Sequence, residues 1–162
     1  MPMYYDLGNL GITATTTSAL AASFLTTTAT NKPSCSITGV WANIGGNAMT
    51  TAGGGYFSGN TWQTVGTQTT TTVANKRNYM NPAASTYCIN AAANGAIGTG
   101  TQYQRITVGC AQTGGPGFWI ATTPDAAWTL PEGGAVNGYG DFLSRTASAS
   151  MLMNWQVEFS EQ

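Results

Sequence analysis

The stretch SMLMNWQVEF, residues 150–159, decides the fold class of this chain. Apolar side chains stand at every second position from 151 to 159, and mostly polar ones stand between them. This period of two is typical of a β-strand that has one apolar face and one polar face. A slip of one residue would carry Asn154, Gln156 and Glu158 into the core, so we expect the register of this strand to be fixed.

Other segments carry the same strand character, and helical periodicity is weak throughout. SCSITGVWANI (34–44) is apolar on both faces, which favours an internal strand. The remaining strand candidates are residues 24–30, 101–110, 117–124 and 127–131. SALAASFL (18–25) supports at most one or two helical turns before a threonine run that prefers extended structure. Several short strands with turn signals between them predict an all-β sandwich or barrel.

The middle of the chain differs from these segments because it is rich in Gly and Thr and poor in large apolar residues. Residues 45–60 read GGNAMTTAGGGYFSGN, and the Thr-rich stretch that follows continues to residue 85. We therefore predict a long excursion with two exposed strands and irregular loops, of the kind that carries contacts rather than core.

Composition limits the classes of protein to which the chain can belong. Its 162 residues suffice for one domain, and the hydrophobic fraction of 42% is ordinary for a globular protein. The charged fraction is 7% and the net charge is −1, so no basic surface for nucleic acid is expected. No apolar run approaches the length of a membrane span, and the first residues lack the pattern of a secretory signal. We expect a protein made in the cytosol, with no membrane or nucleic-acid partner.

The chemistry available to the chain is narrow because it contains no histidine. Catalytic triads that use histidine are impossible, and most zinc and haem sites lose their usual ligands. Asp125 and Glu132 flank a short strand and form a conceivable glycosidase pair, although both also fit ordinary turns, and Asp141 is predicted to be a loop residue. No cofactor or metal is expected.

Three cysteines, Cys35, Cys88 and Cys110, form no metal-binding pair. In RITVGC, Ile106, Val108 and Cys110 share one face of a strand, so we expect buried thiols that pack as small apolar groups. A disulfide between two of the three is the alternative.

The glycine cluster in AQTGGPGFWIATTP (111–124) raises the possibility of a phosphate-binding loop. No lysine follows the glycines and no helix pattern begins there, so the requirements of such a loop are not met. We predict a tight corner between two strands that delivers Phe118 and Trp119 into the sandwich. Trp119 and Trp128 can fill the core, anchor a protein interface or stack on sugars.

A resemblance rests on three segments: KRNYMNPAAS (76–85), RITVGCAQTGGPGFWIATTPDAAWTLPEGGAVNG (105–138) and NWQVEFSE (154–161). Together they resemble small structural proteins of tailed phages. The resemblance implies a jelly-roll β-sandwich that decorates or cements the outer surface of a capsid. It also implies a homotrimer that bridges neighbouring subunits of the major capsid protein, on a virion assembled in the host cytoplasm. It carries no catalytic residues.

The domain prediction separates residues 1–22 from a single β-sandwich over residues 23–162. The first segment is interpreted either as an N-terminal arm that lies over an adjacent subunit or as the first strand of the chain's own sheet. Both alternatives remain open. The candidate capsid or subunit interface comprises apolar residues of this segment and two tryptophans: Tyr4, Tyr5, Leu7, Leu10, Ile12, Trp119 and Trp128.

Three functional hypotheses follow from these observations. The first is a virion structural protein that decorates and cements a phage capsid. The second is a carbohydrate- or receptor-binding head of a phage fibre or spike, which predicts an exposed cluster of Tyr56, Trp62 or Trp119. The third is a glycosidase that uses Asp125 and Glu132.

Overall fold

The computed structural model describes residues 2–26, 34–45, 54–64, 66–68, 74–78, 80–84, 87–90, 95–111, 115–131, 139–147 and 151–162. Within them the chain forms strands and one short 3₁₀ helix, η1 (Pro124–Ala126). The strands are β1 (Met3–Ala14), β2 (Ala19–Leu25), β3 (Cys35–Gly45), β4 (Gly54–Thr64), β5 (Thr67–Gln68), β6 (Asn75–Lys76), β7 (Tyr87–Asn90), β8 (Gly95–Ala96), β9 (Thr99–Ala111), β10 (Gly117–Ile120), β11 (Trp128–Leu130), β12 (Tyr139–Thr146) and β13 (Met151–Glu161). The prediction of an all-β chain is confirmed.

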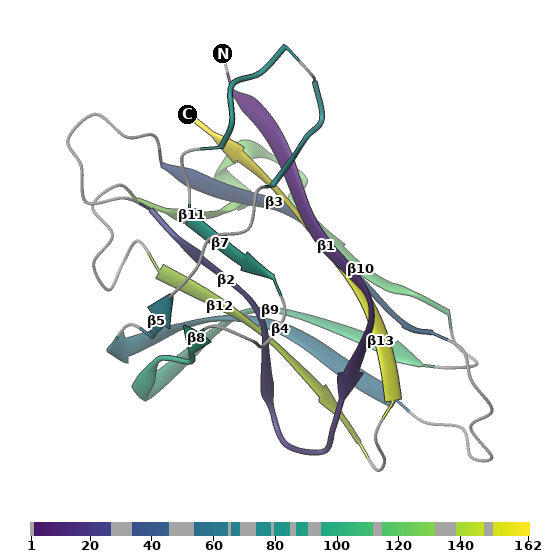
Figure 1. The fold of residues 1–162 in the computed structure, drawn as a ribbon. Coiled ribbons are helices and arrows are strands. Elements are labelled where there is room, and N and C mark those ends of the chain that lie inside the picture. The colour runs from purple at the N-terminus through teal and green to yellow at the C-terminus, as the bar shows by residue number, and fades with distance from the viewer. Residues whose placement is uncertain are drawn as a thin grey trace.

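Two antiparallel sheets pack face to face (Figure 1). Sheet A has the order β10-β3-β13-β1-β6, with β11 also paired to β3, and sheet B has the order β7-β2-β12-β4-β9. Of the eight principal strands, β1, β3, β10 and β13 form one layer and β2, β4, β9 and β12 form the other; the chain changes sheet at every step except from β4 to β9. This order is that of a jelly roll, the type of β-sandwich that the resemblance implied.

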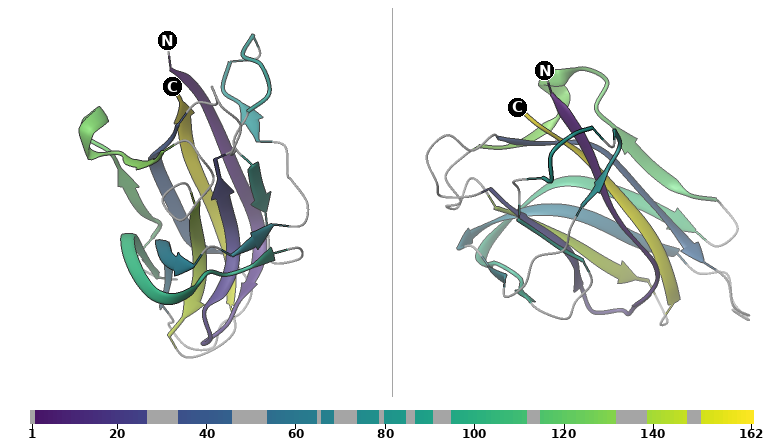
Figure 2. Two further views of the ribbon diagram at one scale, coloured as in Figure 1. Left: turned by 90° about the vertical axis from the view of Figure 1, so that its left-hand side faces the viewer. Right: turned by 45° about the horizontal axis from the view of Figure 1, so that its top comes forward.

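The N-terminal segment is the first strand of the chain's own sheet. Strand β1 pairs with β13 from Met3 opposite Glu161 to Ala14 opposite Met151, and Figure 2 shows the two strands side by side. Of the two alternatives for residues 1–22, the structure therefore contains the first strand rather than an arm. The pairing gives one edge of β1 its backbone partners, and Tyr5 and Leu7 turn into the core, where both are buried.

Strand β13 has the predicted alternation, with Met153, Trp155 and Val157 buried in the core and the intervening residues half-buried. It lies between β1 and β3, so it is an internal strand of sheet A. Strand β3 is also internal, as its apolar character on both faces predicted. The face of β9 that carries Ile106, Val108 and Cys110 is buried as expected.

Aromatic rings fill the space between the sheets around Phe142. Its ring stacks on Phe57 at a centroid distance of 5.3 Å and meets Phe24 edge-on at 5.6 Å. Phe57 stacks in turn on Trp155 at 5.3 Å. These contacts join strands β2, β4, β12 and β13, so the aromatic cluster ties the two sheets together.

Three sequence-based predictions of local structure are wrong. Residues 18–25 contain no helical turn, because Ala19–Leu25 forms strand β2 and pairs with β12. The excursion predicted from residue 45 to residue 85 contains an internal strand, because β4 (Gly54–Thr64) lies between β12 and β9. Asp141 lies on strand β12 and is buried rather than in a loop. Residues 27–30 of the early strand candidate lie outside the described part of the chain.

Strand β4 is internal despite its small residues because larger neighbours fill the space above its glycines. A Cβ atom on Gly59 would lie 2.6 Å from the Trp128 ring, and one on Gly55 would lie 2.9 Å from the end of Met153. Large side chains of sheet A therefore fill the space above the small residues of β4. A count of large apolar residues in β4 alone could not reveal this.

The described glycines of the cluster, Gly115 and Gly117, lie where the chain passes from β9 of sheet B to β10 of sheet A, in agreement with the prediction of a corner between two strands. Gly115 has a φ of +84° and forms an isolated bridge with Ala111. At Gly117 a Cβ atom would lie 1.9 Å from the carbonyl oxygen of Gly109, so only glycine lets β10 approach β9 this closely. The corner does not deliver Phe118 into the sandwich, because that side chain points outward with 70% of its surface exposed.

Candidate functional site

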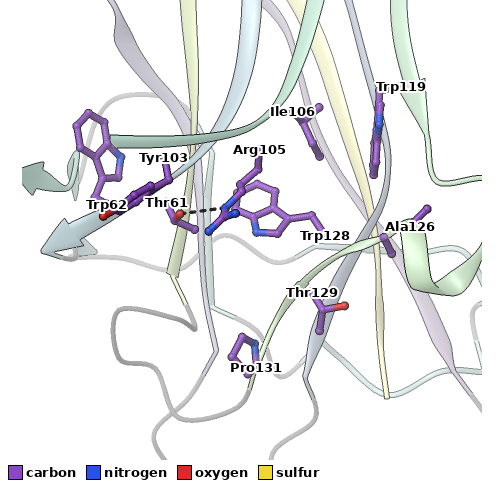
Figure 3. A pocket seen from close by; sticks show the side chains of 11 residues that line it. Thr61, Trp62, Tyr103, Arg105, Ile106, Trp119, Ala126, Trp128, Thr129 and Pro131 are labelled. Carbon is purple, nitrogen blue, oxygen red and sulfur yellow. Dashed lines mark hydrogen bonds between the residues drawn. The ribbon is translucent and has the colours of Figure 1, made fainter. Parts of the chain in front are cut away.

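A cleft of about 580 Å³ opens at the edge of the sandwich, where β9 of sheet B faces β10, η1 and β11 of sheet A. We call it the edge cleft; the described residues that line it are Thr61, Trp62, Tyr103, Arg105, Ile106, Trp119, Ala126, Ala127, Trp128, Thr129 and Pro131. Figure 3 shows Arg105 near its middle, with Trp62 and Tyr103 on one side and Trp119 on the other. Its volume lies in the range of small-molecule sites.

Trp128 is the fixed wall of the edge cleft. Its ring packs into a slot between Gly59 of β4 and Gly140 of β12, where added Cβ atoms would lie 2.6 and 2.7 Å from ring carbons. It also contacts Phe142 at a centroid distance of 5.7 Å. The indole is therefore held by both sheets while half-buried, which presents a rigid aromatic surface to the cleft.

Arg105 is the one charged side chain among the described residues that line the edge cleft. It is the extra residue of a β-bulge, because Ile106 pairs with Gly59 and Gln104 pairs with the next residue, Asn60. Bulges of this kind re-aim a side chain out of the regular pleat.

Two contacts orient the guanidinium of Arg105. Its Nε donates a hydrogen bond to Thr61 Oγ1 at 3.3 Å, and its central carbon lies 5.9 Å from the centre of the Tyr103 ring. The second distance is within the range of a cation–π contact. The single ion pair found within the described residues joins Arg77 to Glu158, so Arg105 has no carboxylate partner among them.

Trp62 links the edge cleft to a second small cluster on the outer face of sheet B. It packs with Leu20, Leu143 and Ile97, and a Cβ atom on Gly98 would lie 2.3 Å from its ring. The segment around Gly98 thus covers this face of the sheet and holds the indole at the mouth of the cleft. Trp62 is half-buried because the segment around Gly98 covers part of its ring.

Asp141 is buried below that covering segment. Its Oδ2 accepts a hydrogen bond from the Gly98 backbone N–H at 2.9 Å, which ties the segment to β12. Burial raises the pKa of the Asp141 carboxyl from 3.8 to about 6, although polar contacts with Tyr139, Gly98 and Trp62 oppose the rise. Burial, followed by the charge of Asp141, also raises the pKa of Tyr139. Asp141 does not line the edge cleft, so its role is structural.

This raised pKa predicts a pH-dependent stability that Asp141→Asn removes. Between pH 3.8 and about 6 the folded state binds the proton more tightly than the unfolded chain, so the free energy of unfolding falls as the pH rises. The neutral amide of Asp141→Asn would keep one acceptor for Gly98 but lose an acceptor oxygen, so the expected effect is on the slope: the wild type should lose about 1–3 kcal/mol between pH 3.8 and pH 7, and the variant should not. Urea unfolding across this pH range checks it, with Asp125→Asn as the exposed control. Parallel pH curves for the wild type and Asp141→Asn would contradict the prediction.

A second surface feature lies on the outer face of sheet A, where Trp41, Phe118 and Ile120 form an apolar group that we call the outer-face patch. Phe118 sits opposite Trp41 in the ladder between β10 and β3. The exposed fractions of Phe118 and Ile120 are 70% and 64%. A groove of about 390 Å³ runs along the patch and is bounded by Gln156 and Glu158 of β13.

Charged and polar groups border the outer-face patch on the side of β1. Arg77 Nη1 forms an ion pair with Glu158 Oε2 at 2.7 Å, and Asn75 Nδ2 donates to Asp6 Oδ1 at 3.0 Å. Exposed Tyr4 lines the adjoining grooves together with Arg77. The face therefore combines an apolar centre with a polar border, which is the usual anatomy of a protein interface.

The structure divides the seven candidate interface residues into groups. Tyr4 is exposed beside the outer-face patch, and Trp119 and Trp128 line the edge cleft. Tyr5 and Leu7 are core residues, and the Tyr5 hydroxyl donates to the Pro82 carbonyl at 3.2 Å. They cannot contact a partner while β1 is paired. Leu10 and Ile12 lie on β1, but their side chains are outside what the structure describes.

The structure brings together two of the three residues proposed for a sugar-binding cluster, and it describes one of the two proposed for a glycosidase pair. Trp62 and Trp119 line the same cleft, whereas Tyr56 lies apart from it on β4. Asp125 is exposed in η1, whose first turn is capped by the Thr123 side chain, and Glu132 lies outside the described residues. Cys35 and Cys110 are buried as expected, and burial raises the pKa of Cys110. The side chain of Cys88 is not described.

The fold and these two surfaces define a jelly-roll protein that carries an aromatic edge cleft and an apolar outer face. Comparison of the chain with protein-family models, curated proteins and solved structures gave no match. Across the described ranges, no helix is long and apolar enough to cross a membrane. The same ranges contain no cluster of three or more His, Cys, Asp or Glu side chains suited to a metal ion.

Proposed function

We propose that this chain is a virion structural protein that decorates and cements the outer surface of a phage capsid, where its outer-face patch docks on the major capsid protein. The observation that carries the proposal is the exposure of Phe118 and Ile120 beside Trp41 on a regular sheet face. Large aromatic side chains on such a face are the usual anchors of a protein interface.

The composition of the surface supports docking on another protein. A chain with 7% charged residues buries few charges on association, and its Thr, Asn and Gln side chains form hydrogen bonds at an interface without the desolvation cost of ions. A cement protein stabilises the assembled shell because it binds that state more tightly than the free subunits. Such a role needs contact area rather than a reactive group.

The resemblance of residues 76–85, 105–138 and 154–161 to structural proteins of tailed phages supports the same assignment. The jelly-roll topology agrees with what that resemblance implies. On this proposal the chain forms a homotrimer at the virion surface and bridges neighbouring capsid subunits.

Replacing Phe118 and Ile120 together with serine is expected to weaken capsid binding. Each truncated anchor costs about 1–2 kcal/mol or more, so affinity should fall about tenfold for each side chain. Cosedimentation with capsids assembled without this protein measures binding, and resistance of the loaded capsids to heat measures cementing. Tyr56→Ser is the matched control, because Tyr56 is 53% exposed on the other sheet.

Two outcomes would overturn the docking proposal. One is a double variant that binds and protects capsids as well as the wild type does. The other is a double variant that still binds capsids but no longer forms oligomers, because the outer-face patch would then join copies of this chain.

A further inference from the structure

We infer that the edge cleft is a binding site for an acidic saccharide, in which Arg105 pairs with a sugar carboxylate while aromatic side chains contact the apolar faces of the sugar rings. This inference goes beyond the proposed function and does not depend on it. The cleft lies at the edge between the sheets, whereas the outer-face patch lies on the exposed face of sheet A.

The aromatic lining favours a sugar over an unstructured acidic ligand. Trp62, Trp119, Trp128 and Tyr103 all line one cleft of about 580 Å³. Sugar rings present C–H groups on one face and hydroxyl groups at the rim, so they suit a cleft with apolar walls and a few polar groups. The hydroxyl groups of Thr61 and Thr129 supply polar partners within the same lining.

The charge of the cleft favours a carboxylate on that sugar. Arg105 is the single charged residue of the described lining, and its Nε is already used by Thr61. The hydrogen bond to Thr61 uses Nε, and no ion pair within the described residues uses the two terminal nitrogens, which leaves them for a bidentate contact with a carboxylate. A neutral sugar would leave this positive group without a counter-charge.

The local fold shows that this arrangement is built into the backbone. The bulge at position 105 turns the arginine out of the ladder between β4 and β9, and the slot between Gly59 and Gly140 fixes Trp128 opposite it. The slot holds the Trp128 ring in place before any ligand arrives, and the contacts with Thr61 and Tyr103 favour one direction of the exposed Arg105 side chain. Such preorganisation lowers the entropy cost of binding.

The five tryptophans provide an internal readout for the test. Trp62 and Trp128 line the edge cleft alone, Trp119 lines both the edge cleft and the groove along the outer-face patch, Trp41 lies on the outer face and Trp155 is buried in the core. The indole N–H signals of the ¹⁵N-labelled protein are followed by NMR during titration with methyl glycosides of glucuronic, galacturonic and N-acetylneuraminic acid. Methyl glucoside and sodium acetate are titrated in parallel.

The expected result is a saturable shift of the three cleft signals with at least one acidic glycoside, while the signals of Trp41 and Trp155 stay in place. Methyl glucoside and acetate should bind at least tenfold more weakly, because methyl glucoside lacks the carboxylate and acetate lacks the sugar ring. Arg105→Gln should weaken binding about tenfold or more, with partial retention in Arg105→Lys. Arg145→Gln, an equal change of charge at an exposed position of β12, should leave binding unchanged.

The inference is overturned if none of the three acidic glycosides shifts the cleft signals in millimolar titrations. It is also overturned if methyl glucoside binds as well as the glucuronide and Arg105→Gln has no effect, because the site would then recognise neutral sugars. Neither result bears on capsid binding, so failure of this inference and failure of the proposed function are distinguishable.

Discussion

Replacing Phe142 with alanine is expected to lower the free energy of unfolding by about 3–5 kcal/mol. The Phe142 ring is fully buried and contacts Phe24, Phe57 and Trp128, so its removal leaves a cavity bounded by three aromatic rings. Rigid rings on strands of both sheets cannot collapse far into that space, because each is held by its own strand. The loss is a large share of the roughly 5–15 kcal/mol that stabilise a typical domain.

Urea unfolding followed by tryptophan fluorescence measures this loss. Phe142→Leu keeps much of the volume and should cost less than Phe142→Ala, which guards the test against a variant that does not fold. Tyr56→Ala is the control at an exposed position of the neighbouring strand β4 and should change stability by about 0.5 kcal/mol or less. Equal effects of the alanine variants at positions 142 and 56 would show that the aromatic cluster does not hold the sheets together.

Gly117→Ala is expected to destabilise the protein by about 1–3 kcal/mol or more. The added Cβ would lie 1.9 Å from the Gly109 carbonyl oxygen and 2.6 Å from a methyl group of Val108. Because the nearest obstacle is backbone, rotation of a side chain cannot relieve the clash. Strand β10 must move away from β9, and that movement also opens the edge cleft near Trp119.

The matched control is Gly109→Ala, at the residue of β9 that Gly117 approaches. A Cβ atom added to Gly109 meets nothing within 4 Å, so Gly109→Ala should stay within about 0.5 kcal/mol of the wild type. The difference in Tm between the two variants therefore reports the close approach at position 117 rather than a general intolerance of alanine. Similar Tm values for both would contradict the described packing of β10 against β9.

The strands that the sequence predicts well are those whose own residues determine burial. Strand β13 alternates apolar and polar residues, and β3 is apolar on both faces, so each one's burial can be read from its own pattern. Strands β4 and β12 were missed because other elements supply what buries them. Gly59 and Gly140 are covered by Trp128, and Asp141 is covered by the segment that contains Gly98.

The candidate site was predictable only in part for a similar reason. Trp119 and Trp128 stand out in the sequence as large residues beside turn signals, and both line the edge cleft. Arg105 did not stand out, because its position depends on a bulge that is defined by pairing with Gly59 and Asn60. The outward direction of Phe118 likewise depends on the register of β10 against β3, in which Phe118 lies opposite Trp41.

The pairing of the first and last strands has a consequence for how the protein is made. Strand β13 lies between β1 and β3, so the centre of sheet A is missing until residues 151–161 have been synthesised. Until then, β1 and β3 each have an edge without a hydrogen-bonding partner, and such edges pair readily with other chains. Sheet A therefore cannot be completed until β13 has been synthesised, and chains interrupted before β13 are expected to aggregate.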